Sequence, residues 1–390
     1  MSLKYNFDIV PNRRNPLVGV KWANYPRDVL PMWIADADFP TAPQIRSALH
    51  EQVEHGVLGY ETPRRPFMEI IAARMKDLYN WEVDPDWIVY TAGVNNGYNI
   101  AARILCSSKK GYLIQPPVYN EFLETEYKTG LPQRVARLEK KVEGSRIKYE
   151  VNFEAFEKGV KRSGMFLLCH PHNPIGKIYS PDELKRMAEI CLGNGVTVVS
   201  DEIHSELLLG GAKFTPLASL SPEIGKHTIT LVSASKAFNV PGLACAFAII
   251  PDDERRKGFQ AMANNMSFEI SSPGLTAARV AYSGKADAWL KSVCRYLTAN
   301  RDFVIEYVQR HLPGIRTTRP DATYLMWLDC SELDLKPSPF EFFLKEAKVA
   351  LSDGGRFGKG SERFVRLNFG TSRKLLKQGL DRMRRALESL

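Results

Sequence analysis

Short apolar runs alternate with amphipathic stretches along the first three quarters of the 390-residue chain. Helical spacing of apolar residues is seen at 41–53, 67–75 and 97–105, and Ser180 followed by Pro181 predicts the start of a further helix. Strands without a polar face are predicted at 87–91, 112–115, 166–169, 196–200, 228–232 and 244–250. This alternation predicts an α/β fold with a mostly parallel central sheet and helices on both faces.

The pattern changes after residue 285. A long helix at 287–312 precedes a strand at 324–328, a helix at 339–348, a strand at 364–369 and a final helix, which predicts a smaller α+β domain. The first 40 residues show no dependable period, so this segment must pack on other parts of the chain. We therefore predict an N-terminal arm at 1–45 that joins the small domain, a large ligand-binding domain at 46–285 and a small domain at 286–390.

Polar residues collect directly after the predicted strands. Ligands of parallel sheets bind beyond the carboxyl ends of the strands, so these residues predict a site at that edge. The residues are Gly93, Tyr119, Asn173, Asp201, Ser233, Ser235 and Lys236.

Lys236 follows the strand at 228–232 and two nearby serines. A lone lysine in such a loop is most often an exposed surface residue. The hydroxyls of Ser233 and Ser235 can instead donate to a phosphate, and an amine in a closed pocket can lose its proton and form a Schiff base with an aldehyde. Lys236 is therefore the leading candidate for a chemical role.

Two further features are compatible with an anionic ligand. The turn at Gly93 joins a strand to a helix, and the backbone N–H groups of such a turn can bind an anion. Arg366 alternates with buried positions of a strand, where it either forms a structural ion pair or binds a carboxylate in a bidentate manner. The glycine-rich segment 353–360 lacks the ending of a phosphate-binding loop and is interpreted as flexible backbone.

Composition narrows the class of protein. The net charge of +9 is spread over the chain without a basic stripe, so no nucleic-acid partner is expected. The six cysteines show no disulfide-like spacing, and no apolar run approaches the roughly 20 residues of a membrane helix. We expect a cytoplasmic protein without a membrane partner.

Four motifs stand in a characteristic order: 172–176 (HNPIG), 201–204 (DEIH), 233–239 (SASKAFN) and 365–368 (VRLN). In this order and spacing they resemble the fold-type I pyridoxal-phosphate enzymes of the aspartate aminotransferase superfamily, over nearly the whole chain. Within that superfamily, segment 31–39 (PMWIADADF) and His204, three residues after Asp201, are similar to the MalY/PatB-type cystathionine β-lyases, or C–S lyases.

The resemblance implies pyridoxal 5′-phosphate as cofactor, a small amino acid as substrate and a homodimer with shared active sites. Lys236 would be the Schiff-base lysine, Asp201 would bind the pyridine nitrogen and Tyr119 would lie against the ring. The remaining implied cofactor contacts are Gly93, Val94, Asn95, Asn173, His204, Ser233, Ser235 and, from the other subunit, Tyr60. The implied substrate contacts are Arg366, Ala35 and Asp36.

Two positions depart from many superfamily members. Ala244 stands where an arginine often binds the phosphate, and His204 stands where aminotransferases have a tyrosine. Because segment 31–39 and His204 both resemble the C–S lyases, cleavage of β-thio amino acids to thiol, pyruvate and ammonia is the expected reaction, with a class I/II aminotransferase as the alternative. For Tyr60, the alternative is a buried turn tyrosine with a purely structural role.

A different class of enzyme would use some of the same residues. Imidazole and carboxylate ligands suit zinc, so a metal-dependent hydrolase is a rival hypothesis. Its ligands would be His170, His172, Asp201 and His204. That reading leaves Lys236 and Arg366 without roles, and we expect no metal. A non-catalytic binding protein on an enzyme scaffold is a third possibility.

Overall fold

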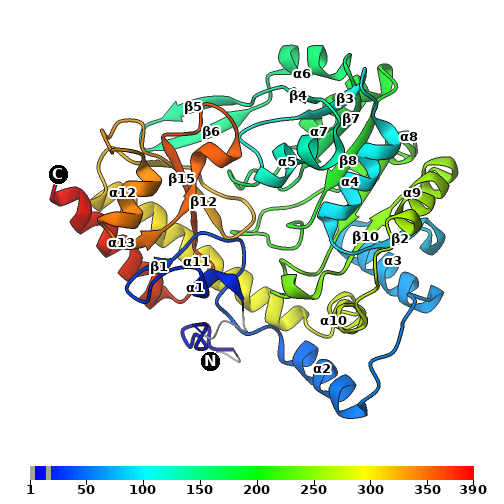
Figure 1. Ribbon diagram of the computed structural model, residues 1–390, viewed down its shortest axis with the longest axis horizontal. Coiled ribbons are helices and arrows are strands. Elements are labelled where there is room, and N and C mark those ends of the chain that lie inside the picture. The colour runs from blue at the N-terminus through cyan, green and yellow to red at the C-terminus, as the bar shows by residue number, and fades with distance from the viewer. Residues whose placement is uncertain (1–4, 15–18) are drawn as a thin grey trace.

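The computed structural model describes residues 5–14 and 19–390, so residues 1–4 and 15–18 of the predicted arm lie outside the described part. A seven-stranded sheet occupies one side of the molecule (Figure 1). From edge to edge its strands are β2 (Ile88–Thr91), β10 (Ala246–Ile249), β9 (Thr228–Val232), β8 (Thr197–Asp201), β7 (Ser163–Cys169), β3 (Gly111–Ile114) and β4 (Gln133–Val135). Only β10 runs antiparallel to its neighbours, which confirms the mostly parallel sheet.

Helices cover both faces of this sheet, as predicted. Successive side chains of a strand point to opposite faces, and in β7 Phe166 packs with Phe156 of one helical layer whereas Leu167 packs with Tyr98 of the other. The helices of this part are α2 (Pro43–His55), α3 (Arg65–Tyr79), α4 (Val94–Leu105), α5 (Asn120–Thr129), α6 (Phe153–Val160), α7 (Pro181–Gly193), α8 (Pro222–Lys226), α9 (Asp253–Asn265) and α10 (Ser272–Tyr282). Ser180 caps α7 through a reciprocal bond with Glu183, as the sequence indicates.

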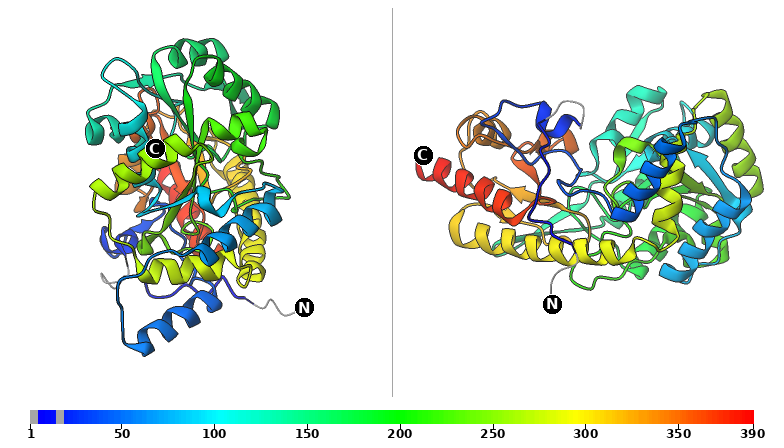
Figure 2. Two further views of the ribbon diagram at one scale, coloured as in Figure 1. Left: turned by 90° about the vertical axis from the view of Figure 1, so that its right-hand side faces the viewer. Right: turned by 90° about the horizontal axis from the view of Figure 1, so that it is seen from below.

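A six-stranded sheet lies on the other side of the molecule (Figure 1). Its order is β14 (Ser352–Asp353), β15 (Phe364–Asn368), β12 (Leu325–Asp329), β11 (Arg316–Thr317), β6 (Arg146–Glu150) and β5 (Glu139–Glu143). Its helices are α11 (Asp287–His311), α12 (Pro339–Lys345) and α13 (Arg373–Glu388). The long helix α11 runs along one side of the molecule toward the seven-stranded sheet (Figure 2).

The hairpin β5–β6 is an element that the apolar pattern did not reveal. It belongs to the segment 46–285 of the sequence, yet Arg146 pairs with Thr317 and so adds the hairpin to the C-terminal sheet. Every residue of β5 is exposed, and in β6 only Ile147 and Tyr149 are buried. The predicted domain boundaries remain predictions. By sequence the hairpin belongs to the predicted large domain, but it pairs with the sheet of the predicted small domain.

The N-terminal segment is held against the C-terminal elements. Strand β1 (Leu30–Pro31) pairs in parallel with β13 (Val349–Ala350), and Asn368 of β15 donates its backbone N–H to Met32. A short helix, α1 (Val20–Ala23), precedes this contact. In the described part of the chain, no helix combines the length and the apolar character needed to cross a membrane.

Candidate active site

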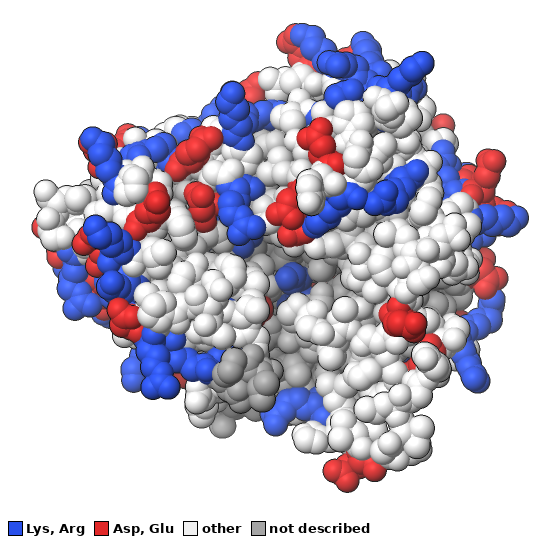
Figure 3. All heavy atoms as spheres, viewed as in Figure 1, with Lys and Arg blue, Asp and Glu red and all other residues white. Residues whose placement is uncertain are grey.

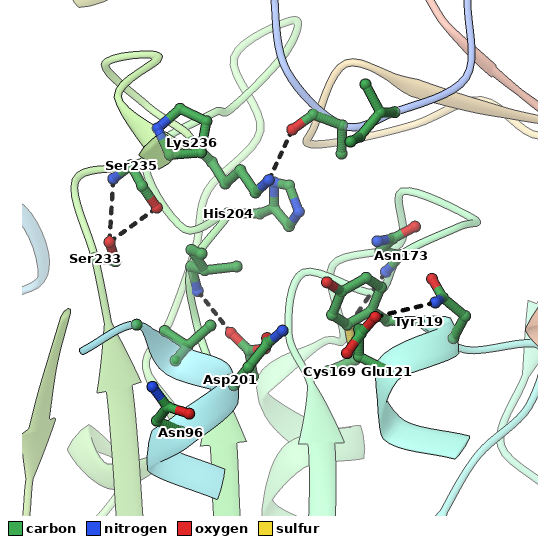
Figure 4. A pocket seen from close by; sticks show the side chains of 18 of the residues that line it. Asn96, Tyr119, Glu121, Cys169, Asn173, Asp201, His204, Ser233, Ser235 and Lys236 are labelled. Carbon is green, nitrogen blue, oxygen red and sulfur yellow. Dashed lines mark hydrogen bonds between the residues drawn. The ribbon is translucent and has the colours of Figure 1, made fainter. Parts of the chain in front are cut away.

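A cavity of about 640 Å³ lies at the carboxyl ends of β7, β8 and β9, where the sequence predicts a ligand site. The face in Figure 3 is hollowed at its centre, with charged side chains of both signs around the hollow. The cavity lining includes most of the predicted site residues: Ala35, Gly93, Val94, Asn95, Tyr119, Asn173, Asp201, His204, Ser233, Ser235, Lys236 and Arg366. Figure 4 shows Lys236 and Asp201 on different sides of the open space, with Tyr119 and Asn173 on a third side.

Lys236 lies four residues beyond the end of β9, and its amine is buried at the cavity. Its Nζ donates a hydrogen bond to the backbone carbonyl of Ala35, at 2.7 Å. Burial lowers the pKa of this amine to about 8; the charge of Arg366 also lowers it, whereas Asp36 and Asp201 raise it. The exposed-lysine alternative is therefore wrong, and this lysine is easier to deprotonate than an ordinary one.

Asp201 is the last residue of β8, and its side chain is only 3% exposed. The backbone N–H of Ile203 donates to Oδ1 at 3.2 Å. Burial raises the pKa of this carboxyl to about 7, although the N–H of Ile203 and the charge of Lys236 lower it. A cationic or N–H partner would stabilise the charged form of this buried carboxyl and so lower its pKa again.

The start of α4 provides backbone donors. The N-cap residue Gly93, with a φ of 95°, has no side chain that could cap the helix, so the first N–H groups are available to the cavity, which Val94 and Asn95 line. Ser233 and Ser235 approach the same cavity, with their hydroxyl oxygens 2.9 Å apart (Figure 4). This combination of neutral donors and a helix N-terminus suits a phosphate.

Arg366 lies on β15 and has neutral partners. Its guanidinium donates to Asn173 Oδ1 at 2.9 Å, to the carbonyl of Trp33 at 3.0 Å and to Ser352 Oγ at 3.1 Å, and it lies 4.8 Å from the ring centre of Phe357. Its Nε has no partner among the described residues, and burial lowers its pKa to about 10. Because its partners are neutral, the guanidinium lacks the carboxylate that it would bind most strongly.

Tyr119 and His204 line the cavity as neutral groups. Burial raises the pKa of Tyr119 to about 12 and lowers the pKa of His204 to about 3. In the described structure His204 Nδ1 is buried without a partner, and its ring meets that of Tyr324 edge to face. An unsatisfied buried nitrogen beside the cavity is expected to gain a partner when a ligand binds.

Two predicted residues do not line the cavity. Asp36 forms an ion pair with Arg13 at 2.7 Å, which holds its carboxylate in the arm, and its role as a substrate contact stays a prediction. Tyr60 is fully exposed, so the alternative of a buried turn tyrosine is wrong. Arg13 itself was missed, because the arm has no period that would single out one of its arginines.

The segment 353–360 differs from the flexible loop that its glycines suggested. Its first residue, Asp353, ends β14, and the next four form the short helix η5 (Gly354–Phe357), of which Arg356 and Phe357 line the cavity. A side chain at Gly354 would lie 2.2 Å from the carbonyl oxygen of Ser361 and 2.3 Å from that of Phe364. Close packing of the backbone therefore explains this glycine.

The residues of the rival metal site bind other groups. A ring nitrogen of His170 lies 3.1 Å from the carbonyl oxygen of Thr215, and those of His172 lie 2.8 Å from the carbonyl oxygen of Pro117 and from the hydroxyl of Tyr179. Within residues 5–14 and 19–390, no three His, Cys, Asp or Glu side chains are grouped so that they could hold a metal ion.

Comparison with known proteins defines the class. The family model of aminotransferase class I and II matches residues 27–383, so the chain belongs to that family. It is 37% identical over 364 residues to the cystathionine β-lyase PatB of Bacillus subtilis (strain 168), covering 92% of this chain and 93% of the relative.

Solved structures agree with this assignment. Cystalysin of Treponema denticola, which contains pyridoxal 5′-phosphate, superimposes with a TM-score of 0.93 at 27% identity and covers 99% of each chain. The PLP-bound C–S lyase of Staphylococcus hominis gives a TM-score of 0.90 at 28% identity, covering 98% of this chain and 99% of its own. The resemblance to fold-type I enzymes is thus confirmed, and with it the α/β fold.

Proposed function

We propose that this protein is a pyridoxal-phosphate-dependent C–S lyase that cleaves β-thio amino acids to a thiol, pyruvate and ammonia. One observation carries the proposal: the buried amine of Lys236 faces the same cavity as the buried carboxyl of Asp201, and burial shifts the pKa of each toward its neutral form. The similarity to PatB and to the PLP-bound C–S lyase of Staphylococcus hominis supports it.

The cavity fits pyridoxal phosphate by the chemistry of its donors. The uncapped start of α4 and the hydroxyls of Ser233 and Ser235 would hold the phosphate. Asp201 would bind the pyridine nitrogen, whose N–H would join the one backbone N–H, from Ile203, that this carboxyl now accepts. Asn173 would donate its amide to the ring oxygen, because its Oδ1 already accepts from Arg366.

The substrate would be bound through its charged α-carboxylate. Arg366 would bind the α-carboxylate with donors that now bond only neutral atoms. When bound, the cofactor supplies an electron sink for the electron pair left at Cα when its proton is removed. Lys236, with its lowered pKa, would remove that proton, and the carbonyl of Ala35 would orient the amine.

Loss of the β-substituent then completes the reaction. The electron pair at Cα forms a double bond to Cβ as the C–S bond breaks, and the sulfur leaves as a thiolate that takes up a proton. Water converts the remaining three-carbon fragment to pyruvate and ammonia. Tyr119 and His204 surround this space as neutral groups, so they add no charge that would repel the departing thiolate.

An aminotransferase is the second candidate, because the family includes that reaction and both reactions begin with removal of the Cα proton. Incubation with a panel of amino acids, with free thiol and keto acid measured together, tests the proposal. We expect equal amounts of thiol and pyruvate from β-thio amino acids. Keto acid formed without thiol would support the aminotransferase instead.

A second copy of the chain completes the proposed site. The apolar side chains of Val57, Leu58 and Tyr60 are exposed on the segment between α2 and α3, which is unusual for a surface that contacts only water. We propose that this surface packs on a second subunit and that Tyr60 reaches the phosphate held there.

The six cysteines are free thiols, which supports a reducing compartment such as the cytoplasm.

Tyr60→Phe is expected to weaken retention of the cofactor about tenfold, because one hydrogen bond to an anion is lost. The dissociation constant of pyridoxal phosphate, measured by equilibrium dialysis, reports this change. Tyr127→Phe is the matched control, since Tyr127 is also exposed but lies on α5. Equal affinity in both variants, or an active monomer in sedimentation, would contradict the shared site.

A further inference from the structure

The carbonyl oxygen of Ala35 accepts two hydrogen bonds, and only one of them comes from Lys236. The amine of Lys236 donates at 2.7 Å (Figure 4), and the hydroxyl of Tyr324 donates to the same oxygen at 2.9 Å. A carbonyl oxygen has two lone pairs, so both of its acceptor positions are filled. The position of the lysine amine is therefore coupled to a tyrosine that does not itself line the cavity.

The peptide group of Ala35 lies outside the strands and is held by side chains. Asp36 donates its backbone N–H to the carbonyl of Ile34 at 2.9 Å, so Ala35 lies at the tip of a three-residue turn. Asn368 donates to the two neighbouring carbonyls, that of Ile34 at 2.6 Å and that of Asp36 at 2.7 Å. The direction of the Ala35 carbonyl thus depends on side chains from distant segments, and Tyr324 is the one that bonds it directly from behind the cavity.

The backbone before Tyr324 is strained in a way that fixes its ring. Thr323 has a φ of 74°, which a β-branched residue rarely adopts, and its Oγ1 accepts the backbone N–H of Leu325 at 3.1 Å. A side chain at Gly370 would lie 3.2 Å from Cγ of Tyr324, so this glycine leaves room for the ring. Strain of this kind is concentrated at functional sites, where it holds a group in place.

The hydroxyl of Tyr324 remains a donor. Its side chain is buried, and its ring meets that of His204 edge to face at 6.3 Å. Burial raises the pKa of the Tyr324 phenol, and nearby charges of both signs alter it less. The O–H group therefore keeps its proton at any pH at which the Lys236 amine changes its charge.

We propose that Tyr324 is a positioning residue: its hydroxyl occupies one lone pair of the Ala35 carbonyl, so that the Lys236 amine bonds only at the other and takes the Cα proton from one fixed position. This rests on the role of Lys236 in the proposed function and adds the residue that directs it. Without the hydroxyl, the amine would bond at either lone pair and its distance from Cα would vary. The O–H group also competes with the ammonium for this oxygen, which favours the neutral amine.

The first test uses the cofactor-free protein, in which the amine of Lys236 is free. Acetylation of Lys236 by acetic anhydride, measured by mass spectrometry as a function of pH, gives the pKa of this amine. That pKa is lowered by burial to about 8 in the wild type. Tyr324→Phe is expected to raise it by about 0.5, because both lone pairs then bond the ammonium. The other groups that face the amine are the same in both proteins: Asp36, Asp201, Arg366 and the neutral His204.

Tyr282→Phe is the matched control for the acetylation experiment. Tyr282 is also a buried tyrosine, but its hydroxyl has no hydrogen-bond partner among the described residues, and it does not line the cavity. Its replacement should leave the pKa of Lys236 unchanged. An unchanged pKa in Tyr324→Phe, or an equal shift in Tyr282→Phe, would overturn the proposal.

Kinetics of the cofactor-loaded protein give a second readout. Tyr324→Phe is expected to lower kcat about tenfold with little change in KM, because the base is less well placed while Arg366 still binds the substrate. The isotope effect on kcat for a β-thio amino acid deuterated at Cα should rise, because proton transfer then limits the rate more strongly. A less stable fold would reduce only the active fraction, so a lower kcat with an unchanged isotope effect would identify a structural role and overturn the proposal.

The two experiments also separate this inference from the proposed function. Absence of thiol from every β-thio amino acid would refute the lyase, and the acetylation result would still decide the role of Tyr324. An unchanged pKa of Lys236 in Tyr324→Phe, with thiol and pyruvate released normally, would refute the positioning role alone.

Discussion

Replacement of Lys236 by alanine is expected to lower kcat by at least about 10⁴-fold. The buried amine has two roles in the account, since it links the cofactor covalently and moves the proton of the substrate's Cα. The hydroxyls and backbone donors that would hold the phosphate belong to other residues, so the variant should still bind pyridoxal phosphate, but reversibly. Steady-state kinetics and cofactor retention during gel filtration measure the two effects separately.

Lys213→Ala provides the control for this prediction, because Lys213 is an exposed lysine that does not line the cavity. The Lys213→Ala variant should retain wild-type activity. The wild-type protein itself should turn yellow when pyridoxal phosphate is added. Near-normal turnover in Lys236→Ala, with a melting temperature like that of the wild type, would show that the lysine is not the catalytic base.

Asp201→Asn is expected to lower kcat about 10²- to 10³-fold with little change in KM. The carboxylate would keep the pyridine nitrogen protonated, and a neutral amide of the same size cannot do so. The variant should still bind the cofactor, because the phosphate contacts are unchanged. Stopped-flow measurement of Cα–deuterium exchange in a labelled amino acid would follow the affected step directly.

Glu202→Gln is the matched control for Asp201. Glu202 is an adjacent buried acid, but it accepts hydrogen bonds from Ser200 at 2.9 Å and from the backbone of Leu217 at 3.2 Å. Its replacement is expected to lower stability and leave kcat within a few-fold of the wild type. If Asp201→Asn and Glu202→Gln lose equal activity, the role of Asp201 is structural.

The central sheet could be predicted because its strands are buried on both faces. The run 228–232 has β-branched residues at four of its five positions and no charged residue, so its identity as a strand does not depend on distant contacts. The site could be predicted from the same pattern, since Asp201 ends β8 and Lys236 lies four residues beyond the end of the neighbouring strand β9. Features that depend only on residues close together in the sequence could therefore be predicted.

The missed features depend on contacts between distant segments. Strand β5 is exposed along its whole length, so no apolar period identifies it. The contact of Lys236 with Ala35 joins positions 201 residues apart. Asp36 was expected to contact the substrate because of the family resemblance, and the sequence did not indicate that its carboxylate would pair with Arg13 of the arm. A sequence indicates that a buried charge must be satisfied, and the fold decides by which group.

The glycine-rich segment 353–360 shows a similar limit. Its glycines indicated flexibility, but Gly354 is required because two backbone carbonyl oxygens lie where its side chain would be. As a result Arg356 was not considered a site residue, although it lines the cavity. Composition alone cannot distinguish a glycine needed for close packing from one that permits motion.

The number of turnovers without a 2-oxo acid tests the central claim most directly. The purified protein, loaded with pyridoxal phosphate, is incubated with excess L-cystathionine, and thiol, pyruvate and ammonia are measured per active site. A C–S lyase should release all three in equal amounts over many turnovers. Turnover that stops after one equivalent and resumes only when a 2-oxo acid is added would contradict the account and identify an aminotransferase.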